Sequence, residues 1–208
     1  LLKQEDVKAV SLCTCSTALP FEAKRALKAG KHVFVEKPMA NTTKEAEKIV
    51  DLARERGLQL TVGFIERFNP GVQRIKDMVK KGEIGDVVSA TARRVGLGPR
   101  RWPEQNMDVG VVKDTAIHDI DIMRYLLAQD PMAVYAKTGN LRHRALEDYA
   151  QIMLTFRDGK TAFIEANWLT PYKVRNLLVT GSEATVYLQF LTQEITIETT
   201  GQSLTPRY

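Results

Sequence analysis

The chain has 208 residues, of which 44% are hydrophobic and 26% charged, and its formal net charge is +5. This length allows one large or two small domains with real hydrophobic cores, and no apolar run is long enough to cross a bilayer. The first residues, Leu1 to Asp6, lack the charge order and the apolar stretch of a signal peptide. We therefore expect a cytoplasmic protein with no membrane partner.

Strands and helices alternate in the first third of the chain. The pattern predicts strands over residues 7–14, 32–35 and 58–64, and helices over 20–29 and 43–56, which end at Gly30 and Gly57. Such alternation is typical of a parallel, Rossmann-type sheet. Cys13 and Cys15 alternate along the first strand, so they face opposite sides and are expected to be free thiols. Three scattered histidines offer no metal site.

Lys37 follows the predicted strand 32–35 and precedes Pro38, which cannot donate a backbone hydrogen bond to a sheet. The chain must leave the sheet there. Ligands of open α/β sheets bind beyond the carboxyl ends of the strands, so this lysine is expected to point into a crevice. A Lys-Pro bond can also be cis, which would fix the direction of the lysine. The alternative is a lysine in an ordinary turn.

The rest of the chain is dominated by longer strands. Asn69 is expected to cap a helix over 70–81, with Pro70 in its first turn. Strands are then predicted over 87–95, 133–138, 148–156, 161–168, 174–180, 184–190 and 194–199. The segments 157–160 and 181–183 between strands are hairpin signals. A mostly antiparallel sheet with one face covered by helices, an α+β domain, is predicted.

A candidate acid/base group lies on the segment between these strands. If residues 114 to about 128 form one α-helix, its period places Asp114, His118, Asp121 and Tyr125 on one stripe. A histidine flanked by carboxylates keeps a defined tautomer, as a general acid/base requires. The alternative is a capping Asp114 followed by a solvent-facing histidine in ordinary salt bridges.

Together, Glu36-Lys37-Pro38 and Asp114-x-x-x-His118-x-x-Asp121 resemble the signatures of the Gfo/Idh/MocA family of nicotinamide-dependent dehydrogenases. The resemblance extends over nearly the whole chain. It implies a partial dinucleotide-binding domain over residues 1–66 and an α+β substrate and dimerisation domain over 67–208. The Gly-x-Gly-x-x-Gly turn of a complete Rossmann domain is missing from the sequence, and so are the expected final helices. We therefore expect an internal piece of a longer enzyme.

The resemblance implies hydride transfer between a sugar hydroxyl carbon and NAD or NADP. The catalytic residues would be Lys37, Asp114 and His118, with His118 as the general base. The cofactor would be bound by Thr14, Glu36, Lys37, Pro38 and Arg67. The chain departs from the family at Thr14-Cys15, where Thr-Pro is usual, and at Leu19, often a histidine. Arg67 and Asn69 would lie near the cleft, although a simple helix cap is the stronger explanation for Asn69.

For the substrate, the string from Asp108 to Asp114 and the arginines near residues 93–101 look most similar to archaeal UDP-N-acetylglucosamine 3-dehydrogenases within the family. The implied reaction oxidises the C3 hydroxyl of a UDP-N-acetylhexosamine. Arg94, Arg100 and Asp121 would bind the substrate, with the arginines on the diphosphate. Residues 142–144 form a further basic cluster. A free sugar or inositol is the alternative substrate.

Two other functional classes are open. A non-catalytic, cofactor-sensing regulator would not need the set Lys37, Asp114 and His118. A nucleic-acid binder has only the positive charge in its favour, and the basic residues are spread over amphipathic helices, so no nucleic acid is expected. The remaining expected partner is a second copy of the chain, bound through the antiparallel sheet.

Overall fold

A computed structural model describes residues 1–98 and 108–199, which form two compact units. The first comprises Leu1–Phe64 together with Asp108 and Val109, and the second the other described residues. None of the helices in these ranges is long and apolar enough to span a membrane.

The first unit contains a parallel sheet of order β1-β2-β3, with two helices between its strands. Its elements are β1 (Ala9–Leu12), α1 (Leu19–Lys28), β2 (His32–Val35), α2 (Thr43–Glu55) and β3 (Leu60–Val62). The Thr42 side chain accepts from the Glu45 amide and so begins α2 as an N-cap. Gly30 and Gly57 have positive φ, the conformation expected of glycines that end helices. The predicted parallel sheet is confirmed.

The first predicted strand, over residues 7–14, is too long at both ends, because β1 spans Ala9–Leu12. β1 stops at Leu12, so Cys13 and Cys15 lie beyond it, and the expectation that they alternate along a strand is wrong. Both cysteines are exposed and free, as expected. The Ser11 hydroxyl and the Cys13 thiol lie 3.4 Å apart.

The second unit is built on a seven-stranded sheet of order β10-β9-β8-β4-β7-β6-β5, in which only β4 and β7 are parallel. Its helical elements are η1 (Ile65–Phe68), α3 (Pro70–Lys81), η3 (Val112–Ala116), α4 (Ile117–Leu127) and η4 (Arg157–Gly159). Its strands are β4 (Val87–Val95), β5 (Ala133–Gly139), β6 (Tyr149–Thr155), β7 (Thr161–Asn167), β8 (Val174–Gly181), β9 (Ala184–Gln189) and β10 (Glu194–Thr199). The predicted mostly antiparallel sheet is confirmed.

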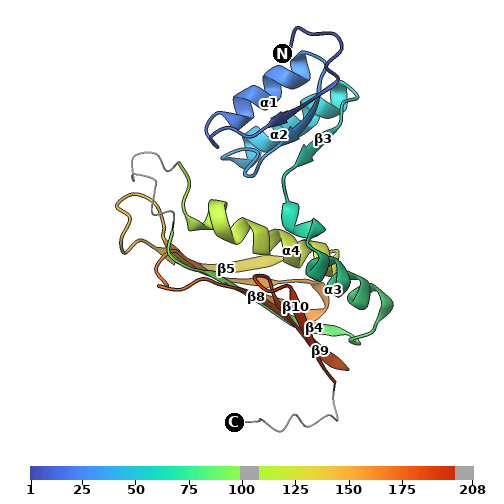
Figure 1. The fold of residues 1–208 in the computed structure, drawn as a ribbon, viewed down its shortest axis with the longest axis vertical. Helices are drawn as coiled ribbons and strands as arrows, with labels where there is room; N and C mark the ends of the chain where they lie inside the picture. The colour runs from blue at the N-terminus through green and yellow to red at the C-terminus, as the bar shows by residue number, and fades with distance from the viewer. Residues whose placement is uncertain (99–107, 200–208) are drawn as a thin grey trace. The chain divides into compact units, whose positions relative to one another are not determined.

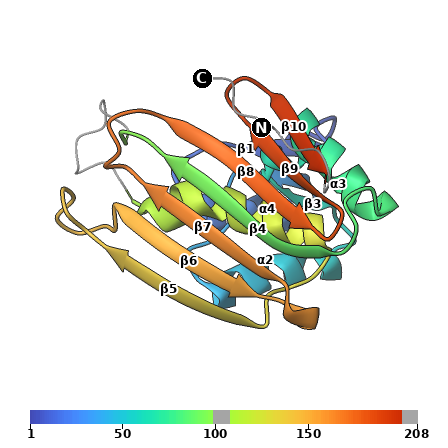
Figure 2. The same cartoon turned by 90° about the horizontal axis from the view of Figure 1, so that it is seen from below.

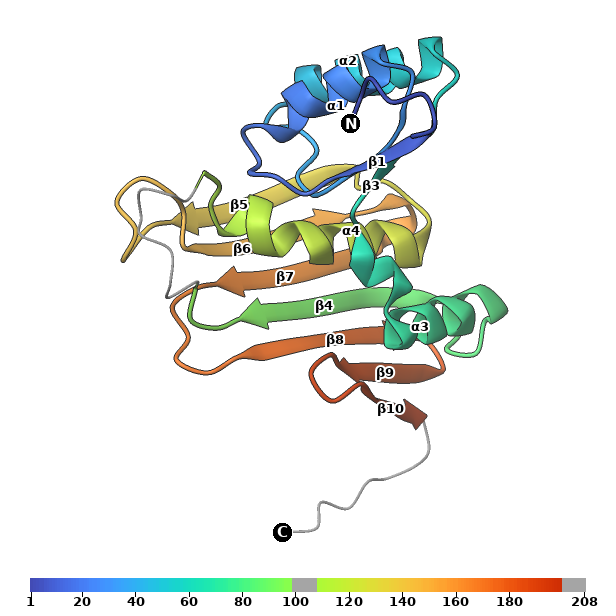
Figure 3. The same ribbon diagram turned by 45° about the horizontal axis from the view of Figure 1, so that its top comes forward.

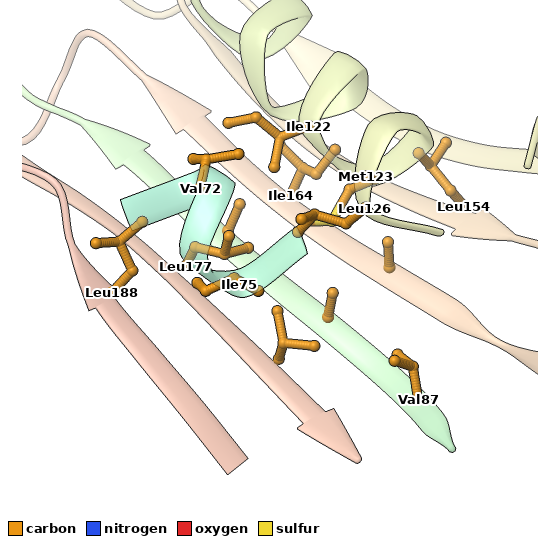
Figure 4. Packing of buried hydrophobic residues seen from close by; sticks show 14 of the residues in the cluster. Val72, Ile75, Val87, Ile122, Met123, Leu126, Leu154, Ile164, Leu177 and Leu188 are labelled. Atoms are coloured by element: carbon orange, nitrogen blue, oxygen red, sulfur yellow. The ribbon is translucent and has the colours of Figure 1, made fainter. Parts of the chain in front are cut away.

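Helices α3 and α4 cover one face of this sheet, and the other face carries no helix in the described chain (Figure 1, Figure 2). The Asn69 side chain caps α3 by accepting from the Gly71 amide, and Gly82 ends it in the left-handed region, as the sequence predicts. Val72 and Ile75 of α3 and Ile122 of α4 are fully buried over the central strands (Figure 4). The core of this unit therefore lies between the helices and the sheet.

Candidate active site

The Glu36-Lys37-Pro38 motif lies at the carboxyl end of β2, the central strand of the first unit. The Lys37–Pro38 peptide bond is cis. The Glu36 carboxylate accepts from the Lys37 amide at 3.1 Å and lies against Gly63, where a Cβ atom would stand 3.0 Å from Glu36 Oε1. The motif therefore leaves the sheet at the strand end where ligands of α/β sheets bind.

Thr14 and Pro38 share the first unit with this motif. The Thr14 hydroxyl donates to Glu22 of α1 at 2.7 Å. Nearby, the Ser16 hydroxyl and the Thr17 amide donate to the Asp108 carboxylate at 2.6 and 3.1 Å. Burial alone would raise the pKa of Asp108, but these hydrogen bonds outweigh it and lower the pKa. Asp108 is thus hydrogen-bonded to the β1–α1 loop, although it lies nearly 100 residues later in the chain.

In the second unit, Asp114 lies in the π-helical turn η3, and His118 lies in the first turn of α4. The prediction of one α-helix starting at Asp114 is wrong. A π turn holds more residues per turn than an α turn, so positions spaced for one α-helical stripe rotate away from it. The side chain of Glu147, from another segment, caps the start of this turn: its carboxylate accepts from the Val112 amide at 3.2 Å.

Two side chains that the sequence did not single out orient Asp114. The Trp168 indole Nε1–H donates to the Thr115 hydroxyl at 3.1 Å, and that hydroxyl donates to Asp114 Oδ2 at 3.1 Å. The hydroxyl has one hydrogen to give, and the indole can only donate, so the direction of the chain is fixed. Trp168 follows Asn167, whose side-chain oxygen accepts from the amides of Leu169 and Thr170 and so shapes the turn after β7.

Asp114, Thr115 and Trp168 line a cavity of about 480 Å³ within the second unit. Its wall also includes Arg94 of β4 and Arg175 of β8. Such a volume suits a small molecule. His118 follows Asp114 after one turn and is half-buried. Lys37 belongs to the first unit.

Arg94 is not available for the predicted diphosphate contact. Its side chain is 4% exposed and donates to Asp119 through Nε and Nη2 at 2.9 and 3.0 Å, and to Glu66 through Nη1 at 2.9 Å. Burial would lower the pKa of Arg94, but the two carboxylates outweigh it and raise the pKa. A phosphate would have to displace a buried carboxylate, and an uncompensated buried charge is costly.

Asp121 and Arg67 form an ion pair with each other. Arg67 donates to both oxygens of Asp121, through Nε at 2.7 Å and Nη2 at 2.6 Å, and the Asp121 side chain is 3% exposed. The hydrogen bond to Asp121 raises the pKa of Arg67. The structure thus places Asp121 and Arg67 in one ion pair, and the predicted roles of Asp121 in the substrate site and of Arg67 in the cofactor site stay predictions. The pair ties η1 to α4, because one partner lies on each.

Arg100 of the predicted substrate site lies outside the described residues. The predicted basic cluster at residues 142–144 does not line the cavity. Residues 142–144 lie in a loop that binds Asp148 through its backbone. The amides of Leu141, Arg142 and His143 donate to the Asp148 carboxylate. Burial would raise the pKa of Asp148, but these amides outweigh it and lower the pKa. Over the described residues, no group of three or more His, Cys, Asp or Glu side chains could hold a metal ion.

The chain matches two family models. Residues 1–64 match the oxidoreductase family with the NAD-binding Rossmann fold, and residues 72–187 match the GFO/IDH/MocA C-terminal domain. The predicted nicotinamide cofactor is therefore confirmed at the level of this domain type.

Named relatives match both units. The chain is 28% identical to scyllo-inositol 2-dehydrogenase (NAD(+)) of Bacillus subtilis, over 95% of this chain and 60% of that protein. It is 26% identical to the solved UDP-N-acetylglucosamine 3-dehydrogenase of Acidithiobacillus ferrooxidans, with a TM-score of 0.84 over 96% of this chain and 61% of that one. It is also 26% identical to the WlbA dehydrogenase of Bordetella pertussis, solved with NADH and UDP-GlcNAcA, with a TM-score of 0.85 over 97% and 62% of the two chains.

The chain thus spans about three fifths of the length of these relatives. The 3-dehydrogenase among them comes from a bacterium, so the archaeal part of the predicted resemblance is not supported. An inositol dehydrogenase and two dehydrogenases linked to UDP sugars match at similar identity, so identity does not choose the substrate.

Proposed function

Because this chain belongs to the GFO/IDH/MocA oxidoreductase family, we propose that its protein oxidises a hydroxyl group of a sugar or polyol with NAD or NADP. The observation that carries the proposal is the Asp114 carboxylate, held by Thr115 and Trp168 on the wall of a ligand-sized cavity. We assign residues 1–66 to the cofactor domain and 67–208 to the substrate domain.

Nicotinamide bound to the first unit would supply the hydride acceptor. The groups at the carboxyl end of β2 fit such a ligand, since the Glu36 carboxylate accepts hydrogen bonds from ribose hydroxyls and the Lys37 ammonium donates them. Thr14 and Pro38 would complete that edge. The bare backbone at Gly63 leaves room for the Glu36 carboxylate, which supports its position there.

His118 would take the proton of the reacting hydroxyl as general base, at its imidazole. Asp114 would orient the imidazole. Lys37 would hydrogen-bond the reacting oxygen and stabilise the developing negative charge. This proposed set of three argues against a cofactor-sensing regulator, which has no need of a proton-transfer set.

For the substrate, we propose the C3 hydroxyl of a UDP-N-acetylhexosamine. Support comes from the similarity to two dehydrogenases linked to UDP sugars and from the cations lining the cavity. The second candidate is an inositol or a free sugar, which the scyllo-inositol dehydrogenase favours.

The test uses the full-length protein with NAD and with NADP, against UDP-N-acetylglucosamine, N-acetylglucosamine, myo-inositol and scyllo-inositol. His118→Ala should lower kcat on the best substrate by ~10²- to 10⁴-fold and leave cofactor affinity unchanged. Arg124→Ala, an exposed position on the same helix, is the matched control and should keep wild-type kcat. Wild-type kcat in His118→Ala would refute the assigned base, and no turnover of any hydroxyl substrate would refute the reaction.

We further propose that two copies of the chain associate through the uncovered face of the seven-stranded sheet. On that face the strand register aligns one cross-strand row, which we call the apolar row: Tyr135, Met153, Phe163, Thr91, Leu178 and Tyr187. Three of its large side chains are exposed, Tyr135 at 70%, Phe163 at 45% and Leu178 at 37%, and Met153 and Tyr187 are partly buried. A contiguous apolar strip across a sheet is a typical interface feature.

A further inference from the structure

We propose that Arg175 forms a subsite for an anionic group on the substrate, a phosphate or a carboxylate attached to the sugar. The inference rests on the proposed oxidation of a sugar and deepens it by naming the substrate class. It assigns to Arg175 the charge recognition that the sequence suggested for Arg94.

Arg175 is a half-buried arginine without an ion-pair partner. Its side chain lies on the wall of the cavity, and within residues 1–98 and 108–199 no carboxylate comes within ion-pair distance of its guanidinium. Lys173, two residues earlier, is exposed and lines the same cavity. Guanidinium groups offer five N–H donors in a planar fork that matches phosphate and carboxylate oxygens.

The neighbour of Arg175 explains why an anion would be favoured there. Arg94 on β4 stands directly opposite Arg175 on β8 in the sheet register. Like charges directly opposite each other destabilise a strand pair. The guanidinium of Arg94 already contacts two carboxylates, Asp119 and Glu66, whereas that of Arg175 contacts none. Burial and, after it, the charge of Arg94 lower the pKa of Arg175, against the more distant carboxylates. A bound anion would supply a countercharge that offsets both effects.

The position of Arg175 relative to Asp114 sets the geometry of the ligand. Both line the same cavity of about 480 Å³, so a sugar held at Asp114 could extend its charged substituent to Arg175. The reacting hydroxyl and the anion would then lie on different carbons of one ligand. A neutral inositol would leave the donors of Arg175 without a charged acceptor, which is unfavourable in a partly buried site.

The experiment compares full-length wild type with Arg175→Gln, Arg175→Lys and the control Arg157→Gln, an exposed arginine in the β6–β7 turn. Binding of UDP alone and of glucuronate alone is measured by calorimetry without cofactor. KM is measured for UDP-N-acetylglucosamine and for myo-inositol. The two binding probes separate a phosphate from a carboxylate as the source of the anion. Thermal unfolding is recorded for every variant.

Arg175→Gln should weaken binding of at least one anionic probe by about 10- to 100-fold, and Arg175→Lys should lose less. KM for myo-inositol should change by less than about threefold, and Tm should not fall, because the Arg94–Arg175 repulsion is removed. Loss of anion binding without turnover of any substrate supports the subsite while refuting the reaction. Turnover with unchanged anion affinity in Arg175→Gln, or equal losses on charged and neutral ligands, overturns the subsite.

Discussion

Trp168 and Thr115 meet in a hydrogen bond of 3.1 Å between the indole Nε1–H and the hydroxyl, although 53 positions separate them in the chain. The Thr115 hydroxyl in turn donates a hydrogen bond to Asp114. The orientation of the candidate catalytic carboxylate is therefore set by a side chain at the end of strand β7, and not only by its own helix.

Thr115→Val removes that hydroxyl and should act through Asp114 as a positioning change. A hydrogen bond to a charged group contributes roughly 1.5 kcal/mol, so kcat should fall by about tenfold. Thr115→Ser keeps the hydroxyl and should restore kcat. Wild-type kcat in Thr115→Val, or no rescue by serine, would contradict the positioning role.

Arg94→Met should destabilise the second unit strongly. It leaves Asp119 and Glu66 without their shared cation, and breaking a buried ion pair typically costs about 3–5 kcal/mol. Arg93→Met is the matched control one residue earlier, because Arg93 pairs with Glu165 at a half-exposed site worth about 0–1 kcal/mol. Urea unfolding of both variants measures the difference. Equal losses would show that the Arg94 network contributes no more than a surface pair.

Asp148→Asn should reveal a pH-dependent contribution to stability. The backbone amides lower the pKa of Asp148 below the unfolded value of about 3.9, so its contribution is complete above that pH. The contribution is lost as pH falls through the lower folded pKa. The variant should therefore lose about 1–3 kcal/mol at pH 7, and its deficit relative to wild type should shrink below about pH 4.

Asp158→Asn, whose side chain is 71% exposed, serves as the control for this series and should show no comparable deficit. Unfolding in urea is followed across the acid range for both variants. A deficit in Asp148→Asn that stays constant down to the lowest pH would mean that the ionised carboxylate is not what holds the loop.

Ala128→Gly should stabilise the protein. Ala128 follows the last residue of α4 and has a left-handed backbone conformation, with φ at 52°. This conformation is strained for a residue with a Cβ atom but not for glycine. The expected gain is roughly 0.5–1 kcal/mol, read as a rise in Tm. Ala136→Gly in the edge strand β5, which has no such conformation, should instead lower Tm. A fall in Tm for Ala128→Gly would contradict the assigned strain.

Phe163→Asp should disrupt the proposed self-association, because it places a charge in the centre of the apolar row. Light scattering coupled to size exclusion should show the full-length wild type as an oligomer and the variant with a lower mass. Phe21→Asp, an exposed aromatic on α1 outside the row, should leave the mass unchanged. A monomeric wild type, or a variant of unchanged mass, would exclude this face as the interface.

Local sequence signals were sufficient for most of the elements. The Asn69 cap, Pro70 and Gly82 delimit α3 at the residues predicted, and alternation delimits β4 and β10. These signals work because caps, turns and period-two patterns depend on residues a few positions apart. These local signals did not predict the π turn at Asp114, because Glu147, which caps its start, lies more than 30 residues away in the chain.

The chemistry of the site divides in the same way. Motif spacing in the sequence singled out Lys37, Asp114 and His118, and the two family models agree with the family that those motifs suggested. The sequence could not tell which charges are already neutralised inside the protein. Arg94 and Asp121 looked like substrate ligands, whereas Arg175 drew no attention. The tertiary structure decided this: the sheet register and the contact between η1 and α4 give Arg94 and Asp121 internal partners, whereas Arg175 faces the cavity. The sequence could not show it, because an ion pair requires proximity in space and its partners here lie up to 54 positions apart in the chain.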